Sequence, residues 1–128
     1  MKDDLVTRIK DDKFAKYVGI KILEVREGYA EAELNINENH LNGVNRVQGG
    51  VIFTLADFAF AAASNSTGFA TVALNVSISF FNAPTGKKIK AVAREFIAQN
   101  RIAGCKVDII DEDGTLVACF NGLGYRKI

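Results

Sequence analysis

The sequence predicts an α+β fold in which an antiparallel sheet wraps around a single long helix. Three observations predict it: an uninterrupted apolar segment with high helix propensity over residues 51–63, alternating segments on both sides of it, and a length of 128 residues, which fits one domain over residues 1–128. The net charge of +1 leaves no basic stripe for phosphate contacts, so we expect no nucleic-acid partner.

The first elements are predicted to be short. Leu5 and Ile9, four residues apart, indicate an amphipathic helix over residues 3–17. A strand is predicted over residues 19–25, with a turn at residues 26–28. Strict alternation then predicts a strand with one apolar face and one polar face, formed respectively by Ala30, Ala32, Leu34 and Ile36 and by Glu31, Glu33 and Asn35.

The central helix contains an unusual charge. Residues 47–86 include one formally charged side chain, Asp57, and it lies inside the apolar segment. A helix that is apolar all round is expected to be buried, and an unpaired buried carboxylate costs several kcal/mol. Because the ten residues after Asp57 include no Lys, Arg or His, Asp57 is the leading candidate for a functional residue.

The second half of the chain is predicted to form strands. Residues 71–81 alternate, with Val72, Leu74, Val76, Ile78 and Phe80 opposed by Ala73, Asn75, Ser77 and Ser79. A break at residues 82–86 contains the only proline. Strands over 88–98 and 101–110 are joined at residues 99–100, and Asp-Gly at residues 113–114 predicts a hairpin turn before a last strand over 116–125.

Composition and short motifs narrow the function classes. The N-terminus lacks the apolar core of a signal peptide, and a 13-residue apolar segment is too short to span a bilayer, so we expect a cytoplasmic protein without membrane contact. Cys105 and Cys119 are expected on paired strands, roughly facing each other as free thiols. His40, the only histidine, is expected at the surface, and the spacing matches no zinc site.

Gly49 and Gly50 precede the central helix and form the second chemical feature. Free N–H groups at a helix start suit a phosphate, a carboxylate or an oxyanion, although two glycines can also serve only a tight turn. Gly49 and Asp57 are eight residues apart, about 12 Å along a helix, whereas a base and an oxyanion donor must both reach one reacting group. If they cooperate, we expect a symmetric dimer with two composite sites.

The segment from His40 through Asn42 to Gly50, followed by Phe53-Thr-Leu-Ala-Asp57 and Ala61-Ala-Ala-Ser-Asn65, resembles the core motif of hotdog-fold acyl-CoA thioesterases. The resemblance is closest to the phenylacetate-pathway (PaaI-type) subfamily and extends over nearly the whole chain. It implies the hotdog fold, no cofactor or metal, and dimers that commonly pair into tetramers.

The resemblance also implies residue roles. Asp57 matches the catalytic carboxylate, which acts as nucleophile or as general base, and the Gly49 N–H matches the group that polarises the thioester carbonyl. Asn42 matches an asparagine that positions the thioester or the water. Further substrate contacts are expected from Gly50, Asn75 and Arg101, with Lys87 and Lys88 as other candidates for the phosphates of coenzyme A.

One departure from the family concerns Gln48, which stands where the family usually has histidine. Glutamine can orient a carbonyl or a water but cannot accept a proton near neutral pH. Two alternatives to hydrolysis of a small aryl- or medium-chain acyl-CoA stay open. The loss of histidine favours a non-catalytic acyl-CoA-binding module, whereas it disfavours a hotdog hydratase or dehydratase, which usually pairs histidine with a carboxylate. An acyl pocket could involve several phenylalanines, most of which are expected in the core: Phe53, Phe58, Phe60, Phe69, Phe80 and Phe81.

Overall fold

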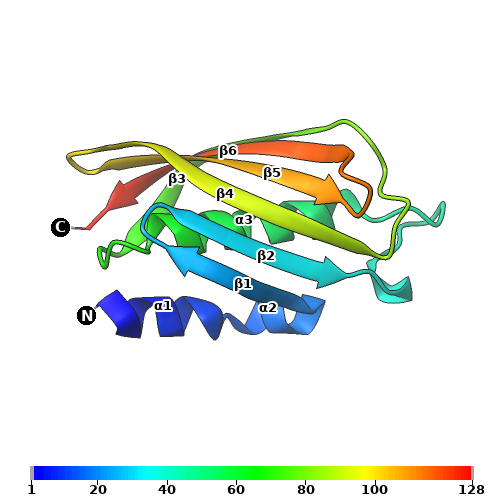
Figure 1. Cartoon of the computed structure of the whole chain (residues 1–128), viewed down its shortest axis with the longest axis horizontal. Helices are drawn as coiled ribbons and strands as arrows, with labels where there is room; N and C mark the ends of the chain where they lie inside the picture. The colour runs from blue at the N-terminus through cyan, green and yellow to red at the C-terminus, as the bar shows by residue number, and fades with distance from the viewer. Residues whose placement is uncertain (1, 128) are drawn as a thin grey trace.

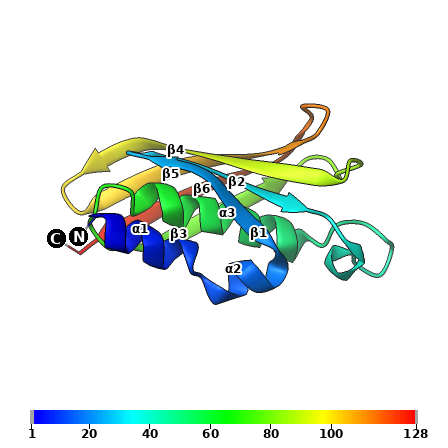
Figure 2. The same cartoon turned by 60° about the horizontal axis from the view of Figure 1, so that its bottom comes forward.

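The structure, a computed structural model, describes residues 2–127, with side chains from Leu5 onward. One antiparallel sheet of six strands curves around the central helix α3 (Gly49–Ser64), and two short helices, α1 (Lys2–Lys10) and α2 (Lys13–Val18), lie on another side of α3 (Figures 1 and 2). The predicted α+β architecture is confirmed. The strands follow the order β1-β2-β4-β5-β6-β3 across the sheet, with these bounds: β1 Ile20–Arg26, β2 Tyr29–Asn35, β3 Thr71–Phe80, β4 Lys88–Gln99, β5 Ile102–Asp111 and β6 Leu116–Arg126.

The N-terminal region differs from the prediction. Instead of one helix over residues 3–17, the chain forms α1 (Lys2–Lys10) and α2 (Lys13–Val18). The break has a local cause, because the Asp12 side chain accepts a hydrogen bond from the Ala15 N–H at 2.9 Å and so caps α2. α2 ends at Gly19, whose left-handed φ of 100° favours glycine.

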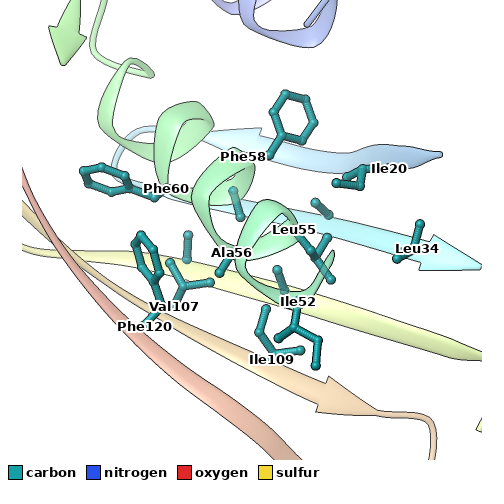
Figure 3. Packing of buried hydrophobic residues seen from close by; sticks show 14 of the residues in the cluster. Ile20, Leu34, Ile52, Leu55, Ala56, Phe58, Phe60, Val107, Ile109 and Phe120 are labelled. Atoms are coloured by element: carbon teal, nitrogen blue, oxygen red, sulfur yellow. The ribbon is translucent and has the colours of Figure 1, made fainter. Parts of the chain in front are cut away.

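The core lies between α3 and the concave face of the sheet. Figure 3 shows Phe58 near β1, the strand of Ile20, and Phe60 near Phe120 of β6, and the ring centroids of Phe60 and Phe120 lie 5.7 Å apart. The predicted inward face of β2 is confirmed, since Ala30, Ala32 and Leu34 are fully buried. Within residues 2–127, no helix combines the length and the apolarity needed to cross a bilayer.

Strand β3 is an edge strand, and here the predicted alternation is wrong for three residues: Val72, Leu74 and Phe80, the last of which is 52% exposed. A bulge between Ala73 and Asn75 interrupts the pairing with β6, and Val72 and Leu74 are 45% and 57% exposed. Val76 and Ile78 still pack against the core. The ten residues of β3 include no charged side chain and no proline, the usual protections of a free edge.

The two cysteines do not face each other as expected. Cys105 lies opposite Gly122, whereas Cys119 lies opposite Asp108, so the thiols stand at different places in the β5–β6 ladder. Both are free. Burial raises the pKa of the Cys105 thiol to about 12, which leaves it protonated and unreactive at neutral pH.

Candidate active site

The start of α3 presents one unpaired hydrogen-bond donor. Gln48 is the N-cap: its side-chain oxygen accepts from the Gly50 N–H at 2.5 Å, and its backbone carbonyl accepts from the N–H groups of Val51 and Ile52 at 2.9 and 3.3 Å. Within the described residues, the Gly49 N–H has no partner. Of the first four N–H groups of the helix, this one remains free to bind a ligand.

Residue Gly50, which we expected to contact substrate, therefore has its N–H occupied by Gln48. The sequence did not indicate this capping role of Gln48, because glutamine is not among the residues favoured at helix starts. The cap uses the oxygen of the Gln48 amide and leaves its NH₂ group available to a ligand.

The loop before α3 is a small hairpin built on Asn42. The side-chain oxygen of Asn42 accepts from the N–H groups of Val44 and Arg46 at 3.0 and 3.1 Å, and Leu41 and Val47 form a bridge that closes the hairpin. The NH₂ group of Asn42 donates to none of the described residues. The loop thus holds Asn42 firmly by its oxygen while its amide donors stay free.

His40 fastens this loop to α2, and the expectation of a surface histidine is wrong. It is 5% exposed. Its Nδ1 accepts from the Asn37 N–H at 3.0 Å, so its Nε2–H donates to the Val18 carbonyl at 2.7 Å. With both ring nitrogens engaged inside the protein, His40 holds the loop and takes no part in the site.

Asp57 lies on the face of α3 that the sheet leaves uncovered. This face follows helical spacing and consists of Gly50, Thr54, Asp57 and Ala61, all half-buried or exposed, whereas most other positions of the helix are buried. In the part of the chain that the structure describes, no group hydrogen-bonds the Asp57 carboxylate. Desolvation, and secondarily the negative charge of Asp12, raise the pKa of Asp57, which makes its carboxylate more basic than usual.

The remaining predicted residues are far from Gly49 within one chain. Gly49 lies against Phe80 at the end of β3, whereas Arg126, whose N–H donates to the Arg101 carbonyl at 2.7 Å, pairs with Thr71 at the start of β3. Ten strand residues separate these ends by about 30 Å. Asn75 lies between them, exposed on the edge strand.

A hollow of about 320 Å³ opens beside Gly49, and two of the phenylalanines suggested for an acyl pocket line it. Val47 and Ile52 line it from the helix side. Phe80 and Phe81, which were expected mostly in the core, line it from the end of β3 and are 52% and 56% exposed. Asn82 and Ala83, in the crossover from β3 to β4, complete the wall.

The crossover, residues 81–87, is held at both ends through its backbone. The N–H groups of Phe81 and Asn82 donate to the Val117 carbonyl at 2.8 and 3.2 Å. At the other end, the buried Asp111 carboxylate accepts from the N–H groups of Thr85 and Gly86 at 2.8 and 3.2 Å, and Glu112 accepts from the Lys87 N–H. The wall of the hollow is therefore fixed relative to β5 and β6.

These groups suit a carbonyl substrate. A carbonyl oxygen can accept from the free Gly49 N–H at the positive end of the helix dipole, and an unpaired carboxylate can act as nucleophile or base. The described residues contain no group of three His, Cys, Asp or Glu side chains that could hold a metal ion.

Comparison with known proteins assigns the family. Residues 45–118, which include Gln48, Gly49 and Asp57, match the model of the thioesterase superfamily. The chain belongs to this superfamily. An Archaeoglobus fulgidus relative, provisionally named an esterase, is 39% identical over 98% of the chain and 85% of its own length.

Escherichia coli acyl-coenzyme A thioesterase PaaI is 33% identical over 91% of the chain and 84% of its own length. The solved structure of E. coli PaaI superposes with a TM-score of 0.92, at 29% identity, and covers 99% of this chain and 94% of that one. These matches confirm the hotdog fold, the PaaI-type resemblance and the prediction of a thioester hydrolase.

Proposed function

We propose that this thioesterase hydrolyses small aryl- or medium-chain acyl-CoA thioesters to the free acid and CoA, with Asp57 and the Gly49 N–H as its catalytic groups. The observation that carries the proposal is the pair of unsatisfied groups on α3, one donor and one carboxylate. The name of the E. coli relative, acyl-coenzyme A thioesterase, supports CoA as the thiol of the substrate.

Two chemical routes fit this pair of groups. In the first, an Asp57 oxygen attacks the carbonyl carbon, the C–S bond breaks, the CoA thiolate leaves, and water hydrolyses the resulting anhydride. In the second, Asp57 takes a proton from a water that attacks the same carbon, and the proton passes to the departing sulfur. In both, the Gly49 N–H stabilises the negative charge on the carbonyl oxygen, while the free amide groups of Asn42 and Gln48 orient carbonyl or water.

The site requires two copies of the chain in this proposal. Gly49 and Asp57 lie about 12 Å apart along α3, too far to act on one carbonyl. Antiparallel pairing of two β3 edges would extend the sheet and lay two α3 helices side by side in opposite directions. The Gly49 of one copy would then face the Asp57 of the other.

The same pairing accounts for the distant Arg101. An antiparallel β3 pair puts the Thr71 end of one strand beside the Phe80 end of the other. Arg101 of one copy would thus approach the Gly49 region of the other and supply a cation for the phosphates of CoA. The exposure of Val72 and Leu74 and the absence of charge on β3 support an edge that is covered by a second copy.

A panel of acyl-CoA thioesters assayed for released thiol tests the function: acetyl, butyryl, hexanoyl, octanoyl, benzoyl and phenylacetyl. Asp57→Asn is nearly isosteric and should fold, yet lose at least about a hundredfold in kcat. Asp108→Asn, a half-buried position on β5 near Lys106, is the matched control and should keep wild-type turnover. Near-full hydrolysis by Asp57→Asn would remove Asp57 from the mechanism and favour the acyl-CoA-binding module.

A further inference from the structure

The free Gly49 N–H and the ring of Phe80 share one small region of the molecule. A Cβ placed on Gly49 would lie 3.4 Å from Cζ of Phe80 and 3.6 Å from its Cε1. The ring of Phe80 therefore points end-on at the backbone of Gly49. The two residues come from different elements, the start of α3 and the end of β3, so their contact is a product of the fold.

The hollow beside this contact has the chemistry of an acyl pocket. Its side chains are apolar except for Asn82, whose NH₂ group is engaged by the Leu116 carbonyl at 2.8 Å. None of the residues that line it carries a charge, so it does not suit the phosphates of CoA. A cavity of about 150 Å³ accommodates benzene, so a hollow of about 320 Å³ has room for an aryl or medium-chain group.

We propose that this hollow receives the acyl group and that Phe80 determines specificity by limiting the bulk on the carbon next to the thioester carbonyl. The inference rests on the proposed function, in which the carbonyl oxygen lies about 3 Å from the Gly49 nitrogen. The carbon that follows the carbonyl must then lie beside the tip of the Phe80 ring. An unbranched methylene fits there, whereas a methyl branch meets the ring.

Two pairs of substrates isolate this effect. Butyryl-CoA and 2-methylpropanoyl-CoA are isomers that differ only in branching, and phenylacetyl-CoA and 2-phenylpropanoyl-CoA repeat the comparison with an aryl group. The wild type should favour the unbranched member by about tenfold in kcat/KM, the range that one misplaced methyl group produces in an apolar pocket. Phe80→Ala should reduce that ratio at least about fivefold, chiefly through faster hydrolysis of the branched member.

Three further variants make the test specific. Phe80→Leu, which keeps an apolar side chain at the strand end, should give an intermediate ratio and guards against a folding defect in Phe80→Ala. Phe81→Ala enlarges the same hollow without removing the Phe80 ring, so it should leave the ratio unchanged. Phe96→Ala, at a phenylalanine that is 62% exposed and does not line the hollow, controls for the loss of a surface ring. An unchanged ratio in both Phe80 variants, or an equal shift in Phe81→Ala, overturns the assignment.

A binding measurement separates this inference from the proposed function. CoA ketones in which a methylene replaces the sulfur cannot be hydrolysed, and calorimetry gives their Kd for the branched and unbranched forms. If Phe80→Ala lowers the ratio of the Kd of the branched ketone to that of the unbranched ketone, the acyl pocket is supported, whether or not the protein releases thiol. Absence of thiol release would contradict only the proposed hydrolysis. Thiol release with equal Kd values in wild type and Phe80→Ala defeats only the pocket. Gel filtration and thermal melts confirm that each variant keeps its fold and assembly.

Discussion

The two ends of α3 are built in opposite ways. At the C-terminal end, buried side chains bind the last carbonyls: the Asn65 amide donates to the Ala61 carbonyl at 2.7 Å and the Ser66 hydroxyl to the Ala63 carbonyl at 2.6 Å. At the N-terminal end, the Gly49 N–H is unpaired among the described residues and Gln48 is exposed. The last carbonyls at the C-terminal end of α3 therefore have hydrogen-bond partners, whereas one N–H donor stays free at the N-terminal end, where we place the chemistry.

A buried ion pair lies near the C-terminal end of α3, which we call the closed end; the N-terminal end is the open end. Arg126 Nη2 lies 2.8 Å from Glu95 Oε2, and the two side chains are only 10% and 11% exposed. Burial raises the pKa of Glu95 despite the neighbouring guanidinium. The open end, taken as the half of α3 from Gly49 to Asp57, has no such pair among the described residues, and the Asp57 carboxylate in the middle of the helix has no hydrogen-bond partner there. The closed end is largely satisfied, although Thr67 Oγ1 and Arg126 Nε are buried there without a partner among the described residues. The open end keeps a free donor and a free carboxylate, and there we place the chemistry.

The largest expected effect comes from complementation between two inactive variants that break the open end. Asp57→Asn removes the carboxylate, and Gly49→Pro removes the N–H. Proline is favoured at the first position of a helix, and Gln48, with φ −63° and ψ 133°, already has the backbone that precedes proline. Each variant alone should be inactive, whereas mixed subunits should recover about half the wild-type activity per heterodimer, because one composite site is intact and the other holds both defects.

Each variant refolded or exchanged with itself is the control for that experiment. Mass spectrometry must show the mixed species, and circular dichroism must show that the Gly49→Pro chain folds. A heterodimer that forms but stays inactive contradicts the shared site, because sites contained in single chains would each carry one defect.

A substitution near the closed end of α3 is expected to cause a large loss of stability. Arg126→Met leaves the Glu95 carboxylate buried without its partner, and we expect the free energy of unfolding in urea to fall by about 3 kcal/mol. Lys106→Met, which removes one side of an exposed pair with Asp108, should change it by less than about 1 kcal/mol. Equal losses in the two variants would mean that burial does not distinguish the pairs, and turnover per folded molecule should be unchanged in both.

Substitutions of Gln48 test how much the stability and the activity at the start of α3 depend on its N-cap. Gln48→Ala releases the Gly50 N–H and should cost about 1 kcal/mol of stability together with a several-fold loss of turnover, through a lost positioning hydrogen bond. Gln48→His should fold and raise activity near neutral pH, since histidine adds a proton acceptor. If Gln48→Ala hydrolyses every thioester tested at the wild-type rate, its side chain serves the helix start alone.

The smallest expected effect is a gain in stability. The folded state raises the pKa of Asp57 above its ordinary value of 3.8, so protonation of Asp57 stabilises the fold. That stabilisation is fully present below pH 3.8 and is lost as pH rises from 3.8 through the higher pKa of the folded state. At neutral pH the ionised carboxylate therefore opposes folding. Asp57→Asn should raise Tm at pH 7, and the difference should shrink as pH falls toward 3.8. A lower Tm for Asp57→Asn at pH 7 would contradict the idea that the open end sacrifices stability.

Local patterns predicted α3 and the inward face of β2, because helical burial and strand alternation depend on neighbouring residues. They missed the exposure of Val72 and Leu74, since only the order of strands across the sheet makes β3 an edge. The hollow beside Gly49 and the burial of His40 also depend on segments that meet only in the folded chain. The roles of all the predicted site residues stay predictions: Asn42, Gln48, Gly49, Gly50, Asp57, Asn75 and Arg101.

The way in which the crossover at residues 81–87 is anchored determines which substitutions it can tolerate during evolution. The crossover contributes mainly backbone N–H groups to its anchors, while Asp111 and Glu112 supply the accepting side chains from outside it. Phe81 and Ala83 can therefore be replaced without loss of those bonds. Gly86 is the exception, because a Cβ there would lie 2.7 Å from Asp111 Oδ1. If the hollow receives the acyl group as we propose, single substitutions in its wall would give new acyl preferences at little cost to the rest of the fold.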